Sequence, residues 1–301
     1  MQNQSPLVSI ITLNYRQAEV TCEFLESCRQ LTYPNYEILV CDMKSAEDPS
    51  EKILKGNYPH TTLYLSEENL GFAGGNNWGM QLAKGEYVLL LNNDTEVQAD
   101  LIQKMLIPFD IDPRAGVVSP KINFFDDPGV IQYAGFGKMN PVTGRNKTWG
   151  FREPDHGQFN QIKPIYGAHG AAMMISREVI EKVGKFPEEF FLYYEEWDWS
   201  TRIRKAGYQI YFQGLATVYH KESMSMGKLN PMKEYYLTRN RILYMRRNSQ
   251  GIKFMAFTVF FTVFTLPKTV LKHLVKGNYL FLKAFLRGIR DNLKMSSYSN
   301  L

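Results

Sequence analysis

Cysteine is scarce in this 301-residue sequence, and the three thiols, Cys22, Cys28 and Cys41, all lie within the first fifty residues. So few cysteines exclude the disulfide framework of a small secreted protein and indicate reduced, buried side chains in a reducing compartment. A secretory signal is also missing, because the first apolar run, residues 7–13, is short and is typical of a strand. No internal repeat is evident. We therefore expect a globular protein that works inside the cell.

A long membrane-spanning run is lacking as well. The apolar segment 254–267 has fourteen residues without a charge, between Lys253 and Lys268. That length is short of the roughly 18–20 residues that a helix needs to cross a bilayer. Lysines and an arginine then alternate with aromatic residues and leucines through 274–289, a pattern typical of a helix in the membrane interface. The alternatives are a core helix packed on the main domain and, less well suited to so apolar a stretch, a nucleic-acid contact.

Acidic residues are nearly absent from the C-terminal part of the chain. Between Arg239 and Lys294 there are twelve lysines and arginines but one acid, Asp291, which gives a charge of about +11. Because the whole chain carries +5, the remainder sums to about −6. This division indicates that the C-terminal segment meets an anionic partner, either a lipid headgroup surface or a nucleic acid.

The rest of the sequence has the composition of a globular protein, with 44% hydrophobic and 22% charged residues. Apolar runs predict strands, and near-helical spacing of apolar residues predicts helices between them. Strands are expected at 7–13, 36–42, 61–66 and 87–94, with helices at 17–31 and 74–84. This alternation predicts a parallel α/β sheet with right-handed crossovers. The second half is more mixed, with strands at 116–122, 170–175 and 208–220 and helices at 177–184 and 195–207.

Polar side chains end three of these predicted strands. Thr12 and Asn14 close the first strand, Asp42 closes the second, and Asn92, Asn93 and Asp94 follow the fourth. Ligands of open parallel sheets bind beyond the carboxyl ends of the strands, so we expect these groups to share one crevice. A glycine-rich loop, 69–77, precedes a predicted helix and would allow close backbone approach to an anion. It lacks the strand and G-x-G-x-x-G spacing of a dinucleotide site.

The order of these pieces resembles family 2 glycosyltransferases, which are inverting enzymes with the GT-A fold, and within them a rhamnosyltransferase-like branch. The segments that carry the resemblance are VSIITLNYR, YEILVCDMKSAED, NLGFAGGNNWGMQLAKGEYVLLLNNDTEV, GAHGAAMMISREVIEKVGKFPEEFFLYYEEWDWSTRIRKAG and VYHKESMS. It spans about residues 7–245. It implies a single Rossmann-like, mostly parallel α/β sheet with flanking helices. The apolar and basic pattern of the last residues, rather than the resemblance, predicts a C-terminal helical extension that associates with membranes. The implied domains are a catalytic domain, 1–230, with a nucleotide-binding half (about 1–95) and an acceptor half (about 96–230), and an extension, 231–301.

The resemblance also assigns roles to individual residues. It places donor-binding groups at Thr12, Asn14, Asp42, Asn69, Gly71, Gly74, Asn76, Asn77, Asn92 and Asn93. Asn92-Asn93-Asp94 stands where the family has D-x-D, which implies that Asp94 holds Mg²⁺ or Mn²⁺ on the donor diphosphate, with His220 as a further contact. A hard cation prefers oxygen ligands and neutralises a leaving diphosphate. A plain Asn-Asn-Asp turn is the structural alternative, and Asn92 leaves one carboxylate where the family has two.

An acid cluster, Glu195, Glu196 and Asp198, supplies the candidate catalytic residues. By resemblance Glu196 stands at the general base, and Asp198 is the second candidate. An inverting transfer needs a base, because the acceptor hydroxyl loses a proton as it attacks the anomeric carbon. Mutual repulsion of these acids raises a pKa among them. The structural alternative is a helix start enriched in acids for its dipole. Trp197 and Trp199 fit either a core or a sugar platform.

These observations predict a metal-dependent inverting glycosyltransferase at the cytoplasmic face of a membrane. Its partners would be a nucleotide-sugar donor, with dTDP-L-rhamnose as the leading candidate, a lipid-linked glycan acceptor and, through residues 239–294, an anionic membrane surface. A UDP-linked hexose or galactofuranose donor is the alternative within the family. A glycoside hydrolase would leave Asp42 and the glycine-rich segment unexplained, since it needs two acids and no nucleotide site. A nucleotide-binding scaffold without turnover is the alternative outside enzymes. Arg239 and Arg241 face either a diphosphate or the membrane.

Overall fold

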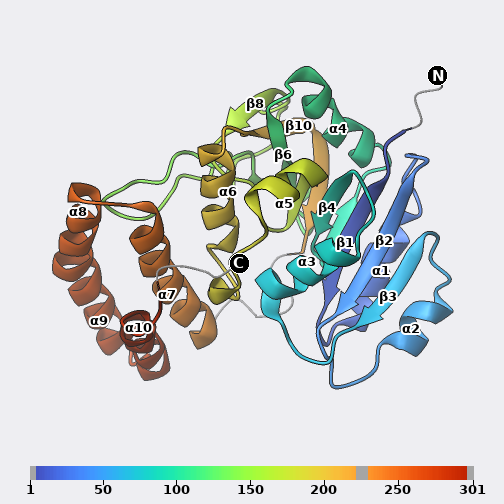
Figure 1. The fold of residues 1–301 in the computed structure, drawn as a ribbon. Helices are drawn as coiled ribbons and strands as arrows, with labels where there is room; N and C mark the ends of the chain where they lie inside the picture. Colours follow the sequence, from blue (N-terminus) through green and yellow to red (C-terminus); the bar gives the residue numbers. More distant parts are fainter. Residues whose placement is uncertain (1–4, 222–229, 297–301) are drawn as a thin grey trace.

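The protein folds around one mixed β-sheet flanked by helices, as a computed structural model shows for residues 5–221 and 230–296 (Figure 1). The order of the main strands is β3-β2-β1-β4-β9-β6-β10-β5, with β7 beside β6 and β8 beside β10. The strands are β1 (Val8–Asn14), β2 (Tyr36–Asp42), β3 (Thr61–Leu65), β4 (Tyr87–Leu91), β5 (Thr95–Val97), β6 (Ala115–Phe124), β7 (Ile131–Tyr133), β8 (Ile162–Ile165), β9 (Ala172–Ser176) and β10 (Gln209–His220). The predicted fold class, an α/β sheet with flanking helices, is confirmed.

The N-terminal half has the expected parallel crossovers. β1 pairs in parallel with both β2 and β4, and β2 pairs in parallel with β3. Their β-branched and leucine-rich runs are buried, because helices cover the strands. The connections run through α1 (Ala18–Cys28), α2 (Ser50–Lys55) and α3 (Gly71–Leu82). The polar ends of β1, β2 and β4 are therefore neighbours.

Antiparallel strands enter in the second half. β9 runs antiparallel to both β4 and β6, and β5 runs antiparallel to β10. The short strand β5 leaves the turn 92–94 and pairs with the end of β10, so that Thr95 stands opposite His220. The helices here are α4 (Leu101–Ile111), α5 (Arg177–Val183) and α6 (Glu195–Lys205), with a 3-10 turn, η1 (Glu188–Phe190), before α6.

The expected glycine-rich loop at 69–77 is instead mostly helix, because α3 already begins at Gly71. Its glycines allow α3 to lie close against the sheet. A Cβ on Gly75 would come within 2.7 Å of the Met43 sulfur, and one on Gly79 within 2.5 Å of the Ile11 side chain. The small residues therefore serve helix–sheet packing in this structure.

The C-terminal part forms a helical group beside α6, at the left of Figure 1. It comprises α7 (Pro231–Asn248), α8 (Ile252–Phe260), a π-helical turn η2 (Phe261–Thr265), α9 (Leu266–Val275) and α10 (Tyr279–Asn292). The segments from Ile252 to Val275 form one helix of 24 residues. The π turn precedes Pro267, which has no N–H to donate to the regular backbone hydrogen bonds of the helix. The prediction that this segment is too short to span a membrane was wrong, since the helix continues beyond the fourteen uncharged residues.

Candidate active site

Asp94 and His220 meet where β4 and β10 end. The pairing of β5 with β10 sets Thr95 opposite His220, and the backbone N–H of Lys221 donates to the Asp94 carbonyl at 2.9 Å. These contacts bring Asp94 Oδ1 to 3.2 Å from His220 Nε2. Both side chains are buried. The structure thus brings together the two residues that the resemblance named for the metal, although the rest of the motif VYHKESMS, residues 222–225, lies outside the described residues.

The surroundings of His220 fit a cation beside Asp94. His220 Nδ1 lies 2.9 Å from Gln132 Oε1, and an Nδ1–H donated to that oxygen leaves the Nε2 lone pair facing a carboxylate oxygen. Metal-binding histidines usually have such a partner on their other nitrogen. Mg²⁺ is commonly held by one or two protein groups together with substrate phosphates. Within residues 5–221 and 230–296, however, no cluster of three or more His, Cys, Asp or Glu side chains has metal-binding geometry.

A hydrogen-bond chain joins the turn 92–94 to the end of β2. Asn93 donates to Thr21 Oγ1 at 3.0 Å, Thr21 donates to Asn14 Oδ1 at 2.8 Å, and Asn14 donates to Asp42 Oδ1 at 2.6 Å. Asn14 and Asp42 are register partners in the parallel β1–β2 pair, which explains their contact. Thr21, on α1, carries no motif and was missed from the sequence. The expected convergence of the three strand ends is therefore present.

Asp42 and Thr12 are more buried than residues that contact a nucleoside would be. The Asp42 side chain accepts from Asn14 and from the Ser45 hydroxyl at Oδ1, and from the Ser45 backbone N–H at Oδ2. Only 2% of Asp42 is exposed, and Thr12 is fully buried within β1. Asp42 thus stabilises the turn after β2, and Thr12 lies inside the fold.

The sequence predicts that backbone N–H groups at the start of α3 face an anion. In the structure, N–H groups of its first turn are bonded within the protein. The Phe191 carbonyl accepts from the backbone N–H groups of Phe72 at 2.9 Å and Ala73 at 3.3 Å. Gly71 has φ +68°, and a Cβ there would come within 2.5 Å of the Phe191 ring. The first turn of α3 is therefore occupied by the segment that leads to α6.

The predicted donor-binding asparagines of the segment 69–77 hydrogen-bond to backbone groups in this structure. Asn77 donates to the Phe186 carbonyl and accepts from the Phe186 N–H, each at 2.9 Å. Asn76 donates to the Phe72 carbonyl at 2.9 Å. Asn69 is exposed and accepts from the Gly71 N–H at 2.9 Å, and Gly74 lies against Leu70. Asn92 is half-buried, and its carbonyl accepts from Thr95.

Glu195 and Glu196 open α6 behind a strained backbone. The residue before the helix, Tyr194, has a left-handed conformation with φ +74°. Burial raises the pKa of Glu196 to about 7. Burial, with the neighbouring charge of Glu196, raises the pKa of Glu195 well above its usual range. A carboxylate with a pKa near neutrality is suited to accept a proton at physiological pH.

Asp198 has a different environment from Glu196. Its two oxygens accept from Arg247 Nε at 2.9 Å, Asn248 Nδ2 at 2.8 Å and Arg202 Nε at 3.2 Å. Asp198 is buried, and this network links α6 to α7. Both oxygens of Asp198 are thus engaged by cations and an amide, and its predicted catalytic role stays a prediction.

A row of packed rings runs from His220, which lies beside Asp94, to Trp197, the residue that follows Glu196. The His220 ring lies 6.3 Å from that of His169, which stacks on Phe136 at 5.7 Å. Phe136 in turn lies 5.0 Å from Trp197 on α6. His169 was not identified from the sequence, where it is a single histidine between small residues. Its Nδ1 accepts from the Ala171 N–H, and burial lowers its pKa to about 3, so that the neutral ring carries its proton on Nε2.

The structure shows the surroundings of the two tryptophans and two arginines for which the sequence left alternative roles. Trp197 and Trp199 are both core residues, and Trp199 donates to the Gly184 carbonyl at 2.7 Å. Arg239 donates to the carbonyls of the segment before α6, and Arg241 donates to the Thr143 carbonyl at 2.7 Å. Both guanidinium groups therefore hold backbone carbonyls in this structure.

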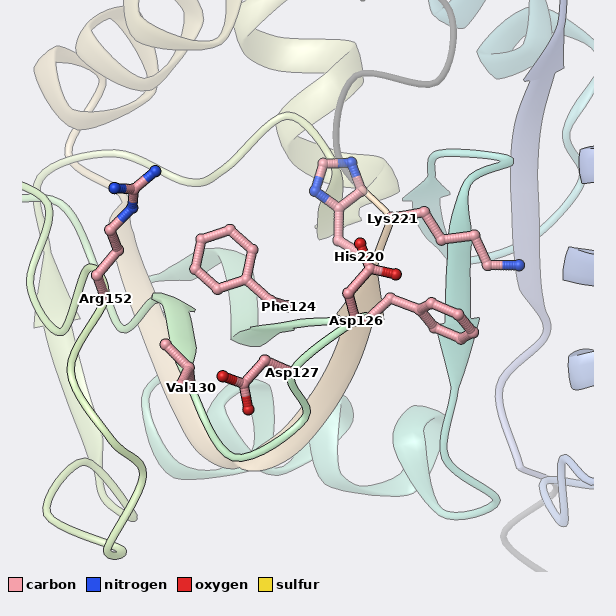
Figure 2. A pocket seen from close by; sticks show the side chains of 8 residues that line it. Phe124, Asp126, Asp127, Val130, Arg152, His220 and Lys221 are labelled. Atoms are coloured by element: carbon pink, nitrogen blue, oxygen red, sulfur yellow. The ribbon is translucent and has the colours of Figure 1, made fainter. Parts of the chain in front are cut away.

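A pocket of about 340 Å³ adjoins His220 on the side of β6 and the loop that follows it (Figure 2). Its lining combines aromatic, acidic and basic side chains: Phe124, Phe125, Asp126, Asp127, Val130, Arg152, His220 and Lys221. Glu196 does not line it. The pocket is therefore adjacent to the Asp94–His220 pair, and a group bound in it would not touch Glu196.

Comparisons with known proteins bear on the family and the fold of the chain. The sequence model of glycosyl transferase family 2 matches residues 9–184, a range that ends before Glu195. The chain is 26% identical over 251 residues to the low-salt glycan biosynthesis hexosyltransferase of Haloferax volcanii, covering 78% of this chain and 74% of that protein. It is 24% identical over 247 residues to the N-acetylglucosaminyl-diphospho-decaprenol L-rhamnosyltransferase of Mycobacterium tuberculosis, covering 74% of this chain and 78% of that protein.

Among solved structures, the fold is similar to that of a mannosyltransferase from Pyrobaculum calidifontis in complex with GDP-Man and Mn²⁺. The TM-score is 0.60 at 17% identity, and the match covers 97% of this chain and 88% of that chain. Similarity at this level of identity concerns the fold.

Proposed function

Because the chain belongs to glycosyl transferase family 2, we propose that it transfers a sugar, with inversion, from a nucleotide-diphosphate donor to a lipid-linked glycan. The observation that carries this proposal is a row of packed rings that runs from His220, beside Asp94, to Trp197, the residue that follows Glu196 on α6. One end can hold an anionic leaving group, and the other can accept a proton. Transfer to an acceptor hydroxyl needs both.

At the donor end, Asp94 and His220 would hold Mg²⁺ or Mn²⁺, which would supply positive charge to the leaving diphosphate. Gln132 orients the His220 ring through Nδ1, and Asn93 fixes the turn through Thr21. The solved mannosyltransferase with the similar fold contains GDP-Man and Mn²⁺. A nucleotide-sugar donor and a divalent metal are proposed here on that support.

At the acceptor end, Glu196 is proposed as the general base. Its carboxylate takes the proton from the acceptor hydroxyl while that oxygen forms the new bond to the anomeric carbon and the donor C–O bond breaks. The diphosphate leaves with the bonding electron pair. Burial and the neighbouring charge of Glu196 raise the pKa of Glu195 well above its usual range, which disfavours a second negative charge beside the base. Positioned bases of this kind contribute roughly 10²–10⁴-fold to the rate.

The donor is proposed to be dTDP-L-rhamnose, with a UDP-linked hexose or galactofuranose as the alternative. Support for rhamnose is the 24% identity to a rhamnosyltransferase, while the similar Haloferax protein is named a hexosyltransferase. The name of the rhamnosyltransferase also describes a lipid diphosphate acceptor, which supports the proposal of a lipid-linked acceptor.

We place the active site at the cytoplasmic face of a membrane, held there by α8, η2, α9 and α10. In the most apolar window of the helix from Ile252 to Val275, 11% of the residues are buried, at a mean hydropathy of 1.6. Length and composition would allow this helix to span a bilayer. We favour an interfacial position because Phe257, Phe261 and His273 are buried on one side of the helix, against the rest of the protein.

A donor panel tests the proposed function directly. The purified protein is mixed with a polyprenyl-diphosphate-linked sugar, Mn²⁺ and, one at a time, dTDP-L-rhamnose, UDP-hexoses, UDP-galactofuranose and GDP-mannose. We expect product with one donor and an inverted anomeric configuration by NMR. Nucleotide-sugar binding without turnover would favour a scaffold protein, and hydrolysis of glycosidic bonds without a nucleotide would favour a hydrolase.

A further inference from the structure

The segment 189–194, which leads into the proposed base, has a backbone that proteins rarely adopt. Phe191, Tyr193 and Tyr194 all have positive φ, at +61°, +68° and +74°. For bulky side chains this conformation is strained, and it persists where surrounding contacts over-determine it. Glu195 and Glu196 follow immediately, so the direction in which α6 starts depends on this segment.

Donors from outside the segment bind each of its first five carbonyls. Arg239 donates to the Glu189 and Phe190 carbonyls at 2.7 Å. Asn240 donates to the carbonyls of Phe190 at 2.9 Å, Leu192 at 2.7 Å and Tyr193 at 2.8 Å. The Phe191 carbonyl is bound from the other side by the first turn of α3. The strained backbone is thus held between α3 and α7.

Asn240 is the centre of this arrangement. It is fully buried, and its two N–H bonds serve three carbonyls while its own Oδ1 accepts from Arg239 Nε at 2.8 Å. An aspartate of the same shape would place a carboxylate oxygen against three carbonyl oxygens. The requirement at this position is therefore for a hydrogen-bond donor, because a side chain of equal size without N–H groups would repel the backbone.

We propose that Asn240, supported by Arg239, is a positioning residue for catalysis: through the carbonyls of residues 189–193 it fixes the start of α6 and thereby the place of Glu196. This proposal rests on the proposed function of Glu196. It assigns α7, which the sequence placed in the C-terminal extension, to the catalytic machinery. Small displacements of a reacting group cost large factors in rate, about 10²-fold for 1 Å.

The test compares Asn240→Asp with Thr238→Ala, a buried polar change on the same helix. Thr238 is buried where α7 meets α10 at Gly288. For Asn240→Asp we expect kcat to fall by about 10-fold or more while the donor KM stays within about 2-fold. Thr238→Ala should keep the wild-type kcat below its melting temperature.

Hydrogen–deuterium exchange supplies a readout that does not depend on turnover. Peptides covering 189–196 should exchange faster in Asn240→Asp than in wild type or Thr238→Ala, while peptides from β1 and β2 should not change. If Asn240→Asp does not fold, Arg239→Met is measured in its place. That change removes the two hydrogen bonds from Arg239 to the carbonyls of Glu189 and Phe190. Wild-type kcat together with unchanged exchange in 189–196 would overturn the proposal. If the wild-type protein turns over no donor, the proposed function fails, and the exchange result still decides whether Asn240 positions this segment.

Discussion

Asp94 Oδ1 lies 3.2 Å from His220 Nε2, although Asp94 lies in the turn after β4 and His220 ends β10, far along the chain. The antiparallel pairing of β5 with β10 creates this contact, because Thr95 is the register partner of His220. The second nitrogen of His220 lies against Gln132. A histidine oriented in this way beside a carboxylate is the feature on which the metal prediction depends.

We predict that Asp94→Ala abolishes transfer and weakens donor binding, since the diphosphate loses a group that holds its counter-charge. Isothermal titration with the nucleotide diphosphate, with and without Mn²⁺, should show that Mn²⁺ strengthens binding to the wild type and has no effect on the variant. Glu181→Ala, an exposed acid on α5, serves as the control. Full activity of Asp94→Ala in EDTA would contradict the metal assignment.

Glu196→Gln should keep donor binding and lose turnover by roughly 10²-fold or more, because the amide keeps the shape but cannot accept the proton. Asp198→Asn is the matched comparison on the same helix. It should chiefly lower the melting temperature, because Arg247 and Arg202 lose a buried counter-charge. An inactive but stable Asp198→Asn beside a nearly normal Glu196→Gln would reverse the two assignments.

The pH dependence follows from the raised pKa of Glu196. The base must be deprotonated, so the kcat of the wild type should rise with pH and level off above about pH 7. In Glu196→Asp the levelling point should move, because the shorter side chain changes the burial of the carboxyl. A wild-type profile that is flat between pH 5 and 8 would be inconsistent with Glu196 as the titrating base.

The contribution of Glu196 to the stability of the fold should fall with rising pH, whereas kcat should rise. A carboxyl whose pKa is higher in the folded state binds its proton more tightly there, so its contribution to the free energy of unfolding falls as pH rises from about 4.5 to about 7. Glu196→Gln cannot titrate, so this fall in the free energy of unfolding is absent from the variant. We expect its melting temperature, relative to wild type, to increase from pH 5 to pH 8, whereas exposed Glu47→Gln should show a constant difference. A constant difference for Glu196→Gln as well would argue against a raised pKa.

Membrane attachment is tested on the exposed apolar face of the helix 252–275. The double change Val259→Glu and Val263→Glu puts two acids on that face, where 55% and 56% of these residues are exposed. Co-sedimentation with anionic liposomes should fall strongly, because apolar burial is lost and the acids are repelled. Leu54→Glu, 66% exposed on α2, should bind like wild type.

Salt and alkaline carbonate distinguish the modes of attachment. Of the twelve basic residues counted from the sequence, the six arginines contact protein groups, which leaves six lysines, each worth about 1 kcal/mol at an anionic surface. An interfacial helix should be released by carbonate and weakened by high salt. Resistance to both would indicate a spanning helix, and equal, negligible binding of wild type and variant would exclude the membrane role.

Local sequence determined much of the fold. Runs such as 36–42 and 87–91 became buried strands because β-branched and leucine side chains must leave water, and Gly207 ends α6 with φ +96°. The convergence of Asn14, Asp42 and Asn93 also followed from sequence, since parallel strands end at one edge of a sheet. These features depend on nearest-neighbour chemistry and on topology.

Tertiary structure alone decided which polar groups remain available for a ligand. Asp42 and Asn77 looked equally suited to the donor in the sequence, yet both are occupied by neighbouring backbone and side-chain groups. Asp198 differs from Glu196 because its carboxylate accepts hydrogen bonds from Arg247 and Asn248, which lie on a helix far along the chain. A residue type states which hydrogen bonds a side chain can make. Which of them are already made depends on segments that only folding brings into contact.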